Sequence, residues 1–303
     1  MKKITFIVLT CNKLEQTTKP FIESLYKYTD QSDFNLIIID NGSSDKTVSY
    51  IKSLKYNNIT TVFNTENLGF SKGMNQGLKL KRNLEQTKYI GLLNNDILFT
   101  KDWLVEALKG FEYDHTIGSI SPRVNSLSSV YENINSENYL QKYPQYLEKY
   151  KEPITYTIKP YYCCAIFKSE VIEQVGLLDE NFSPAFYEDD DYSMRILCKG
   201  WKNACVNHSF VFHNHCSTSG QLKNKNELIE KNKIYFYKKH YLGKYIHESL
   251  SYMNFPYYNK SFYLFLRFLY YILPIKKFRA NIRQIAKIYL WRMNIGKNDI
   301  ITL

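Results

Sequence analysis

The stretch Leu36-Ile37-Ile38-Ile39-Asp40-Asn41-Gly42-Ser43-Ser44-Asp45 joins a short apolar run to a polar turn. The isoleucines predict a buried strand, and Gly42 with the serines predicts a turn into a helix that a serine or Asp45 caps. Asp40 differs from these capping residues, because a carboxylate at the end of a buried strand needs a partner or a function. In that position it can accept the imide N–H of a pyrimidine base.

The same pattern recurs along the first 120 residues, where short β-branched runs alternate with amphipathic stretches. Such alternation predicts a mainly parallel sheet with helices on both faces. The expected strands are Ile4–Leu9, Leu36–Ile39, Ile59–Phe63 and Tyr89–Leu93, and the expected helices lie in Leu14–Tyr28, Asp45–Leu54 and Phe70–Leu80. Ligands of these sheets bind at the carboxyl ends of the strands, so the strand ends are the candidate site.

Polar residues follow every one of these strands and are expected to meet at one sheet edge. The strand ends are Thr10-Cys11-Asn12, Asp40 to Asp45, Asn64 to Gly69, and Asn94-Asn95-Asp96. Asn94 and Asp96 can face a diphosphate through a divalent metal, which prefers oxygen ligands. The sequence contains neither of the common Gly-rich phosphate loops, which argues against kinases and dinucleotide enzymes.

Charge is distributed unevenly along the 303 residues, which carry 40 Lys+Arg and 29 Asp+Glu and have a globular composition with 44% hydrophobic residues. From Gln221 to Leu303 there are sixteen basic and four acidic residues, so the net charge of +11 belongs to this tail. Apolar residues at helical spacing between Phe278 and Tyr289 predict a helix lying in a membrane surface, and a helix packed on its own domain is about equally compatible. The tyrosines nearby favour the membrane.

Targeting and redox signals are weak. The six cysteines have no framework spacing and are expected to be reduced, intracellular thiols. The N-terminal residues lack the features of a signal peptide. The longest apolar run, Phe262 to Pro274, contains Arg267 and is shorter than the roughly 20 residues that cross a bilayer. No membrane span is therefore expected.

The acidic run Glu188-Asp189-Asp190-Asp191 is expected to open a helix, since apolar residues flank it on both sides. A solvated patch or a helix start favoured by the dipole is the plain interpretation. The functional interpretation is that one acid faces a cleft as a general base, with a pKa raised above that of an isolated aspartate by its crowded neighbours. Arg195, one helical turn beyond Asp191, is expected to pair with it.

His213 follows the apolar run Phe210-Val211-Phe212 and is a candidate metal or diphosphate ligand. His215 is expected to point away, so that only one of the two faces the cleft. Lys72 can reach a phosphate, although a lysine on a helix is usually solvated. The adjacent Cys163 and Cys164 are expected to be buried apolar residues, because no second cysteine pair accompanies them.

Taken together and in order, these motifs resemble family 2 glycosyltransferases with the GT-A fold. The similar segments are Thr10-Cys11-Asn12, Asp40 to Asp45, Asn67-Leu68-Gly69-Phe70, Leu93 to Asp96, Gly176 to Phe182, Glu188 to Asp191 with Arg195 and Gly200, and His213. The resemblance covers roughly residues 3 to 240 and is greatest to the bacterial rhamnosyltransferase and cell-surface polysaccharide branch. It implies an α/β fold, a mixed and mainly parallel sheet flanked by helices, followed by a basic, aromatic helical extension.

The resemblance also implies a division of the chain. Residues 1–240 form the glycosyltransferase domain, in which 1–120 bind the nucleotide sugar and 121–240 hold the acceptor and the catalytic group. Residues 241–303 form a helical, membrane-associating extension. Arg123 to Lys159 is irregular and stands where the family places acceptor-binding insertions, and the bulky Tyr162-Cys163 is expected to narrow the acceptor site.

Roles for individual residues follow from the same resemblance. Asp189 is implied as the general base of an inverting transfer, with Glu188, Asp191 and Arg195 supporting it. Asp96 and His213 are implied as ligands of Mg²⁺ or Mn²⁺, and Asn94 stands where many members have a first carboxylate. The implied donor-binding residues are Thr10, Asn12, Asp40, Asn67, Gly69, Lys72, Asn94 and Asn95.

The expected partners are a UDP- or dTDP-sugar, a glycan or lipid-linked glycan acceptor, and the anionic inner face of the cell membrane, with no nucleic acid. Two alternatives remain. A sugar nucleotidyltransferase of related fold would need a Gly-rich loop with Arg or Lys after the first strand, and Thr10 to Leu14 lacks one. A non-catalytic protein that binds membrane or nucleic acid through the tail would leave the acidic helix start unexplained.

Overall fold

The computed structural model describes residues 2–80, 87–125, 134–215 and 224–240. Contacts divide the chain into two units, Met1–Lys225 and Asn226–Leu303. The predicted membrane-associating extension, 241–303, lies outside the described residues, and the predicted boundaries at 120 and 240 stay predictions. Within the described residues, no helix is both long enough and apolar enough to cross a membrane.

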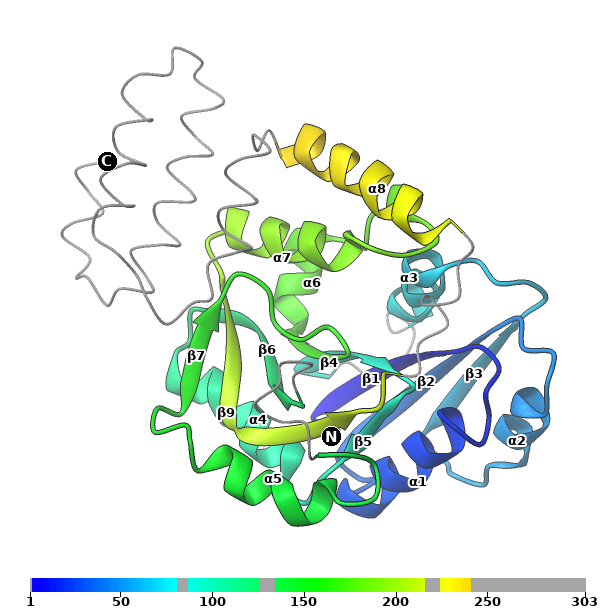
Figure 1. The fold of residues 1–303 in the computed structure, drawn as a ribbon, viewed down its shortest axis with the longest axis horizontal. Helices are drawn as coiled ribbons and strands as arrows, with labels where there is room; N and C mark the ends of the chain where they lie inside the picture. Colours follow the sequence, from blue (N-terminus) through cyan, green and yellow to red (C-terminus); the bar gives the residue numbers. More distant parts are fainter. Residues whose placement is uncertain (1, 81–86, 126–133, 216–223, 241–303) are drawn as a thin grey trace. The chain divides into compact units, whose positions relative to one another are not determined.

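The described part of the first unit is built on a nine-stranded sheet in the order β3-β2-β1-β4-β8-β6-β9-β5, with β7 paired to β9 (Figure 1). Its first four strands are parallel, and antiparallel pairing begins where β8 joins β4. The strands are β1 Ile4–Thr10, β2 Phe34–Asn41, β3 Ile59–Asn64, β4 Tyr89–Asn94, β5 Ile97–Phe99, β6 Ile117–Val124, β7 Ile154–Thr157, β8 Cys164–Lys168 and β9 Lys202–His213. The sheet is therefore mixed, as predicted.

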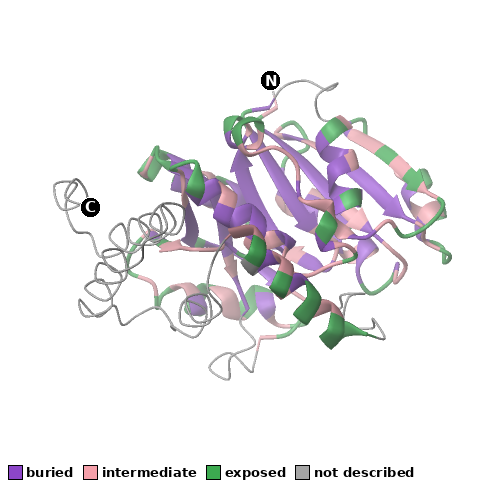
Figure 2. Ribbon diagram, turned by 90° about the horizontal axis from the view of Figure 1, so that it is seen from above, coloured by how far each residue is buried: buried purple, intermediate pink, exposed green. Residues whose placement is uncertain are grey.

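Helices cover both faces of the sheet, and alternation along the strands explains why. Phe6 of β1 packs in one apolar cluster with residues of α1 and α4, while Ile7 packs in a second cluster with residues of α3 and α7. Figure 2 shows the buried strands enclosed by helices whose outer faces are exposed. The helices of the first unit are α1 Thr18–Tyr28, α2 Thr47–Ser53, α3 Phe70–Leu80, α4 Trp103–Tyr113, α5 Tyr139–Leu147, α6 Ser169–Val175 and α7 Glu188–Cys198. All of α8, Lys225–His240, except its first residue belongs to the second unit.

The segment Arg123 to Lys159 is more regular than its sequence indicates. It contains α5 and β7, so the expectation of an irregular insertion was wrong in part. Tyr139 and Tyr146 of α5 pack on Phe210 and Phe212 of β9 in a separate aromatic cluster. These partners are distant in the sequence, so the local pattern of polar and aromatic residues gave no sign of them.

Candidate functional site

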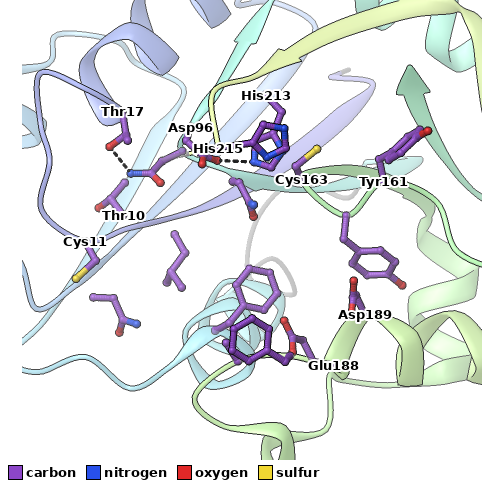
Figure 3. Close-up of a pocket in the computed structure, with 18 of the residues that line it drawn as sticks. Thr10, Cys11, Thr17, Asp96, Tyr161, Cys163, Glu188, Asp189, His213 and His215 are labelled. Atoms are coloured by element: carbon purple, nitrogen blue, oxygen red, sulfur yellow. Dashed lines mark hydrogen bonds and ion pairs between the residues drawn. The ribbon is translucent and has the colours of Figure 1, made fainter. Parts of the chain in front are cut away.

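A cleft of about 610 Å³ opens at the carboxyl ends of β1 and β4. Segments that are far apart in the sequence line it, including the loop after β1, the turn after β4, the loop before β8 and the start of α7. Figure 3 shows Asp96 and His213 on one side, with Glu188 and Asp189 across the cleft from them. Residues predicted separately as metal ligands and as catalytic acids therefore share one cavity.

Asp96 is positioned by the tight turn between β4 and β5 and is almost fully buried. Its Oδ1 lies 3.1 Å from Nε2 of His213 at the end of β9. Its Oδ2 is buried and has no hydrogen-bond partner among the described residues. A buried carboxylate oxygen without a partner is costly, and a divalent cation would satisfy it.

The pKa of His213 is raised to about 10. Burial lowers it, but the neighbouring Cys163 and the hydrogen bond to Asp96 raise it by more. Without a cation in the cleft, the imidazole therefore carries the positive charge that balances Asp96. A bound cation would take over that role, because a histidine ligates metals only through a neutral ring nitrogen.

His215 also lines the cleft, so the expectation that it points away was wrong. Its ring centroid lies 4.1 Å from that of His213. The strand ends at His213, and His215 has a φ of 51°, so strand geometry does not apply to it. Even within a strand, residues two apart would point to the same face.

Asp189 lies in the first turn of α7 with a quarter of its side chain exposed. Its Oδ2 is 3.0 Å from Nζ of Lys159, and its Oδ1 accepts a hydrogen bond from the Asp190 amide at 2.9 Å. Burial raises the pKa of Asp189, but the ion pair with Lys159 lowers it by more, and the net direction is downward. The prediction of a raised pKa was therefore wrong, because Lys159 is remote in the sequence.

The two acidic neighbours of Asp189 have raised pKa values instead. Burial, together with the nearby charge of Asp189, raises the pKa of Glu188 to about 8. Its Oε2 is buried with no hydrogen-bond partner among the described residues. Burial also raises the pKa of Asp190 to about 6, although Lys159 lies 2.9 Å from its Oδ2. The acidic run is thus a coupled group in which Asp189 is the most readily ionised.

Asp191 and Arg195 form the pair that their spacing predicts, with 2.8 Å between Arg195 Nε and Asp191 Oδ2. Asp191 is fully buried and does not line the cleft. Arg195 also donates to the Val175 carbonyl at the end of α6. The pair therefore fixes α7 against α6, and the support that it gives to the acidic run stays a prediction.

Across the cleft from the start of α7, Thr10 lines the cavity and donates to Oδ1 of Asp40 at 3.1 Å (Figure 3). Asp40 has no exposed surface and also accepts a hydrogen bond from the Ser43 amide at 3.0 Å. Its oxygens thus bind the protein, and a contact with a nucleotide base stays a prediction. Asn12 lies outside the lining too, since its Oδ1 accepts from the Ser44 amide at 2.7 Å and joins two loops.

The loop before α3 is shaped by a network of amides. Oδ1 of Asn67 accepts hydrogen bonds from Asn41 Nδ2 at 2.8 Å and from the Gly69 amide at 2.9 Å. Gly69 has a φ of 82°, and a Cβ there would lie 2.9 Å from Oγ of Ser183. Glycine is therefore required where this loop meets the chain that leads into α7.

The remaining predicted donor-binding residues separate into two kinds. Asn94 and Asn95 line the cleft, and Asn95 donates to Thr17 and Thr18 at 3.0 Å each. Lys72 is exposed on α3 and does not line the cleft. Its expected contact with a phosphate stays a prediction.

One lining residue, Lys159, had no role in the sequence analysis. It ends a segment without periodicity, and no local pattern relates it to Asp189. Cys163 is buried, as predicted, and also lines the cleft beside His213, while its expected narrowing of the acceptor site stays a prediction. Its aromatic neighbour Tyr161 is more than a third exposed at the same cavity.

Few side chains at the cleft could bind a divalent cation. No group of three or more His, Cys, Asp or Glu side chains in the described parts of the chain is arranged to hold a metal ion. Asp96 and His213 provide one carboxylate oxygen and one imidazole. A cation at this site would need further ligands, and the oxygens of a diphosphate in the cleft are suited to supply them.

Curated proteins include relatives of part of this chain. A curated relative, poly-beta-1,6-N-acetyl-D-glucosamine synthase from Staphylococcus aureus strain COL, is 28% identical over 144 residues, which is 46% of this chain and 33% of the relative. The same enzyme from strain MSSA476 is 28% identical over 145 residues. The chain thus spans about a third of the length of these relatives.

Solved glycosyltransferase structures share the fold. A mannosyltransferase from Pyrobaculum calidifontis in complex with GDP-Man and Mn²⁺ has a TM-score of 0.57 at 14% identity, covering 97% of this chain and 72% of that chain. GalNAc-T7 with UDP, GalNAc and Mn²⁺ has a TM-score of 0.56 at 17% identity, covering 100% and 58%. Residues 1–349 of TarS from S. aureus have a TM-score of 0.55 at 13% identity, covering 96% and 92%.

These likenesses confirm the predicted GT-A fold. The family profile described as Glycosyl transferase family 2 matches residues 5–176, which is more than half of the chain and includes β1 to β8. The matched region contains the strand ends, Asp96 and Lys159. This chain is therefore a member of glycosyl transferase family 2.

Proposed function

We propose that this protein is an inverting glycosyltransferase that moves a sugar from a UDP- or dTDP-sugar to a hydroxyl of a glycan or lipid-linked glycan. The observation that carries the proposal is that Asp189 lies across one cleft from Asp96 and His213 (Figure 3). A base and a diphosphate-binding group on opposite walls suit a displacement in which the acceptor attacks from the side opposite the leaving group.

The proposed step conserves atoms and charge. Asp189 accepts the proton of the acceptor hydroxyl as its oxygen forms a bond to the anomeric carbon. The bond between that carbon and the diphosphate oxygen breaks, and the electron pair leaves with the nucleoside diphosphate. Asp189 suits this role because it is ionised and partly open to the cleft, whereas Glu188 is buried and has a raised pKa. The proton then passes to solvent when the product leaves.

The donor's diphosphate is proposed to lie beside Asp96, His213 and Asn94. A divalent cation held by Asp96 and His213 would neutralise the charge that develops on the leaving diphosphate. An imidazole in the ligand set favours Mn²⁺ over Mg²⁺, because Mg²⁺ strongly prefers oxygen. Two of the similar structures contain Mn²⁺, one with GDP-Man and the other with UDP, which supports a nucleotide-sugar donor.

The acceptor and the place of action are proposed from the relatives and from the charge of the tail. The curated relatives are poly-beta-1,6-N-acetyl-D-glucosamine synthases of Staphylococcus aureus, which supports a glycan acceptor in a bacterial cell. The basic tail supports a cytoplasmic enzyme that is peripheral on the inner face of the membrane. The transferred sugar is proposed to be a hexose or a deoxyhexose such as rhamnose.

The membrane proposal has a direct test. A variant that ends after about Tyr252 should lose co-sedimentation with anionic vesicles, and binding of the full chain should weaken as salt rises. Neutral vesicles serve as the control. Equal sedimentation of both chains at all salt concentrations would contradict the proposal.

The enzymatic proposal is tested by incubation with a panel of UDP-, dTDP- and GDP-sugars in Mg²⁺ or Mn²⁺ and measurement of released nucleoside diphosphate. One donor class is expected to be consumed, faster when a glycan acceptor is added. Pyrophosphate release from a nucleoside triphosphate and a sugar phosphate would instead identify a nucleotidyltransferase. Membrane or nucleic-acid binding without any turnover of the panel would favour the non-catalytic alternative.

A further inference from the structure

Lys159 joins the wall of the cleft to the acidic start of α7. Its Nζ lies 3.0 Å from Asp189 Oδ2 and 2.9 Å from Asp190 Oδ2, so a single ammonium bridges two carboxylates. We propose that Lys159 is a positioning residue, which fixes the Asp189 carboxylate in the cleft and keeps it ionised. This inference rests on the proposed role of Asp189 as the general base.

The backbone around Lys159 is anchored on both sides. Before it, the carbonyl of Ile158 accepts a hydrogen bond from Asn203 Nδ2 at 2.7 Å, and Asn203 is buried in β9. After it, the amide of Tyr161 donates to Oγ of Ser121 in β6 at 3.0 Å. The lysine therefore extends toward α7 from a segment tied to two strands of the sheet, and its ammonium is held where the ion pair forms.

The charges around Asp189 explain why such a cation is needed. Glu188 and Asp190 flank it on α7, and the phenol of Tyr162 approaches it from the segment before β8. Burial in this acidic group would by itself raise the pKa of Asp189. Lys159 supplies the opposite charge, and the pKa of Asp189 moves downward while those of its two acidic neighbours rise.

The ion pair leaves Asp189 able to accept a proton. An ionised carboxylate has about four lone-pair sites. Lys159 and the Asp190 amide engage one site on each oxygen, and the side chain keeps a quarter of its surface exposed. The two bonds thus fix the rotamer of the base while its remaining lone pairs stay open to an acceptor hydroxyl.

The test compares Lys159→Met, Lys159→Arg and the surface control Lys109→Met, whose ammonium pairs with Glu106 away from the cleft. The readout is kcat and KM against pH for the panel donor that the wild type consumes fastest. Lys159→Met should lower kcat about 10- to 100-fold while the donor KM changes little, since a misplaced group can cost that much. The acidic limb of its pH profile should move upward by about one to three pH units, and Lys159→Arg should restore most of both.

A second measurement needs no substrate. Carbon-13 titration of the aspartate carboxyls, with the Asp189 resonance assigned through Asp189→Asn, should show Asp189 ionising at higher pH in Lys159→Met than in the wild type. Thermal unfolding of each variant establishes that it is folded, and Lys159→Arg keeps the test decisive where Lys159→Met is unstable.

Three results would overturn the inference. One is an unchanged pH profile and titration in a folded Lys159→Met variant. Another is a raised donor KM at unchanged kcat, which would make Lys159 a phosphate ligand instead. The third is a loss of activity that Lys159→Arg does not relieve at any pH. Asp189→Asn separates the two proposals, because full transfer by that variant refutes the general base itself, whatever Lys159 does.

Discussion

Two sets of polar residues at the cleft differ in how their hydrogen-bonding groups are satisfied. The loops after β1, β2 and β3 form a scaffold wall, where Thr10, Asp40, Asn41 and Asn67 bond mainly to one another and to the backbone. By contrast, Asp96 and Glu188, which lie across the cleft from each other, each bury an oxygen that has no partner in the described residues. The scaffold wall is shaped by its internal bonds, whereas the two unsatisfied oxygens mark where charge is available for a ligand or a reaction.

The largest expected effect is on sugar transfer and comes from Asp189 at the start of α7. Asp189→Asn should keep donor binding yet lower transfer by roughly 10²-fold or more, since the amide cannot accept the hydroxyl proton. Transfer rates and donor affinity of the purified variant measure this split. Asp33→Asn, which alters only a surface ion pair with Lys3, is the matched control. Transfer at the parental rate would remove Asp189 from the mechanism.

The second-largest effect is expected on UDP binding and comes from Asp96, whose Oδ2 has no hydrogen-bond partner in the described residues. Asp96→Ala should weaken metal-dependent binding of UDP by at least about 10-fold, because the site loses its carboxylate and His213 loses its partner. Calorimetric titration of UDP with and without Mn²⁺ measures the change. Glu148→Ala, at an exposed position, is the control. If Asp96→Ala and the wild type bound UDP with identical affinity in Mn²⁺, Asp96 would have no part in binding the diphosphate.

The third effect is expected on stability and concerns Glu188, whose Oε2 is buried without a partner in the described residues. Its pKa is raised to about 8, so its contribution to stability is fully present below the ordinary pKa of glutamate and is lost as pH rises through 8. Relative to Glu188→Gln, the wild type should therefore lose stability between about pH 5 and pH 8, by at most about 1.4 kcal/mol per pH unit. Urea unfolding across this range measures it, with the exposed Glu112→Gln as control. A pH-independent difference would show that Glu188 is ionised in the folded protein.

The smallest effect is expected from the scaffold wall. Asn41→Ala leaves the Leu68 amide and the side chains of Asn64 and Asn67 short of a partner, which should lower the free energy of unfolding by about 1–3 kcal/mol. Donor affinity should fall only modestly, because the bonds lost are internal. Asn57→Ala, at an exposed position, should change stability by less than about 0.5 kcal/mol. A large loss of affinity at unchanged stability would make Asn41 a ligand-binding group instead.

Features that depend on residues close together in the sequence could be predicted from the sequence. The β-branched runs became β1 to β4 with ends within a few residues of expectation, and the Asp191–Arg195 pair follows from helical spacing. The confirmed GT-A fold and the family required the order of several motifs rather than any one of them. Of the residues expected to meet at the strand ends, Thr10, Asn94 and Asp96 line one cleft with His213 and Asp189, whereas Asn12 and Asp40 do not line it.

What the sequence could not provide was contact between distant segments. Lys159 is separated from Asp189 in the sequence by β8, α6 and a short 3-10 helix, and its effect reverses the direction in which crowding alone would move the pKa of Asp189. The same limit concealed α5, whose tyrosines pack on β9. In both cases a partner from another part of the chain decides the outcome. The position of His215 was missed for a local reason, because β9 ends at His213 and residues two apart in a strand share a face.

Near Gly69 the scaffold wall touches the chain leading into α7, where the Phe70 amide donates to the Pro184 carbonyl at 2.8 Å. This bond uses main-chain atoms alone, so most changes of side chain at either position leave it in place. The spacing between the loop before α3 and the chain leading into α7 is thus held at this point by the backbone, so side chains on either segment can change without altering it.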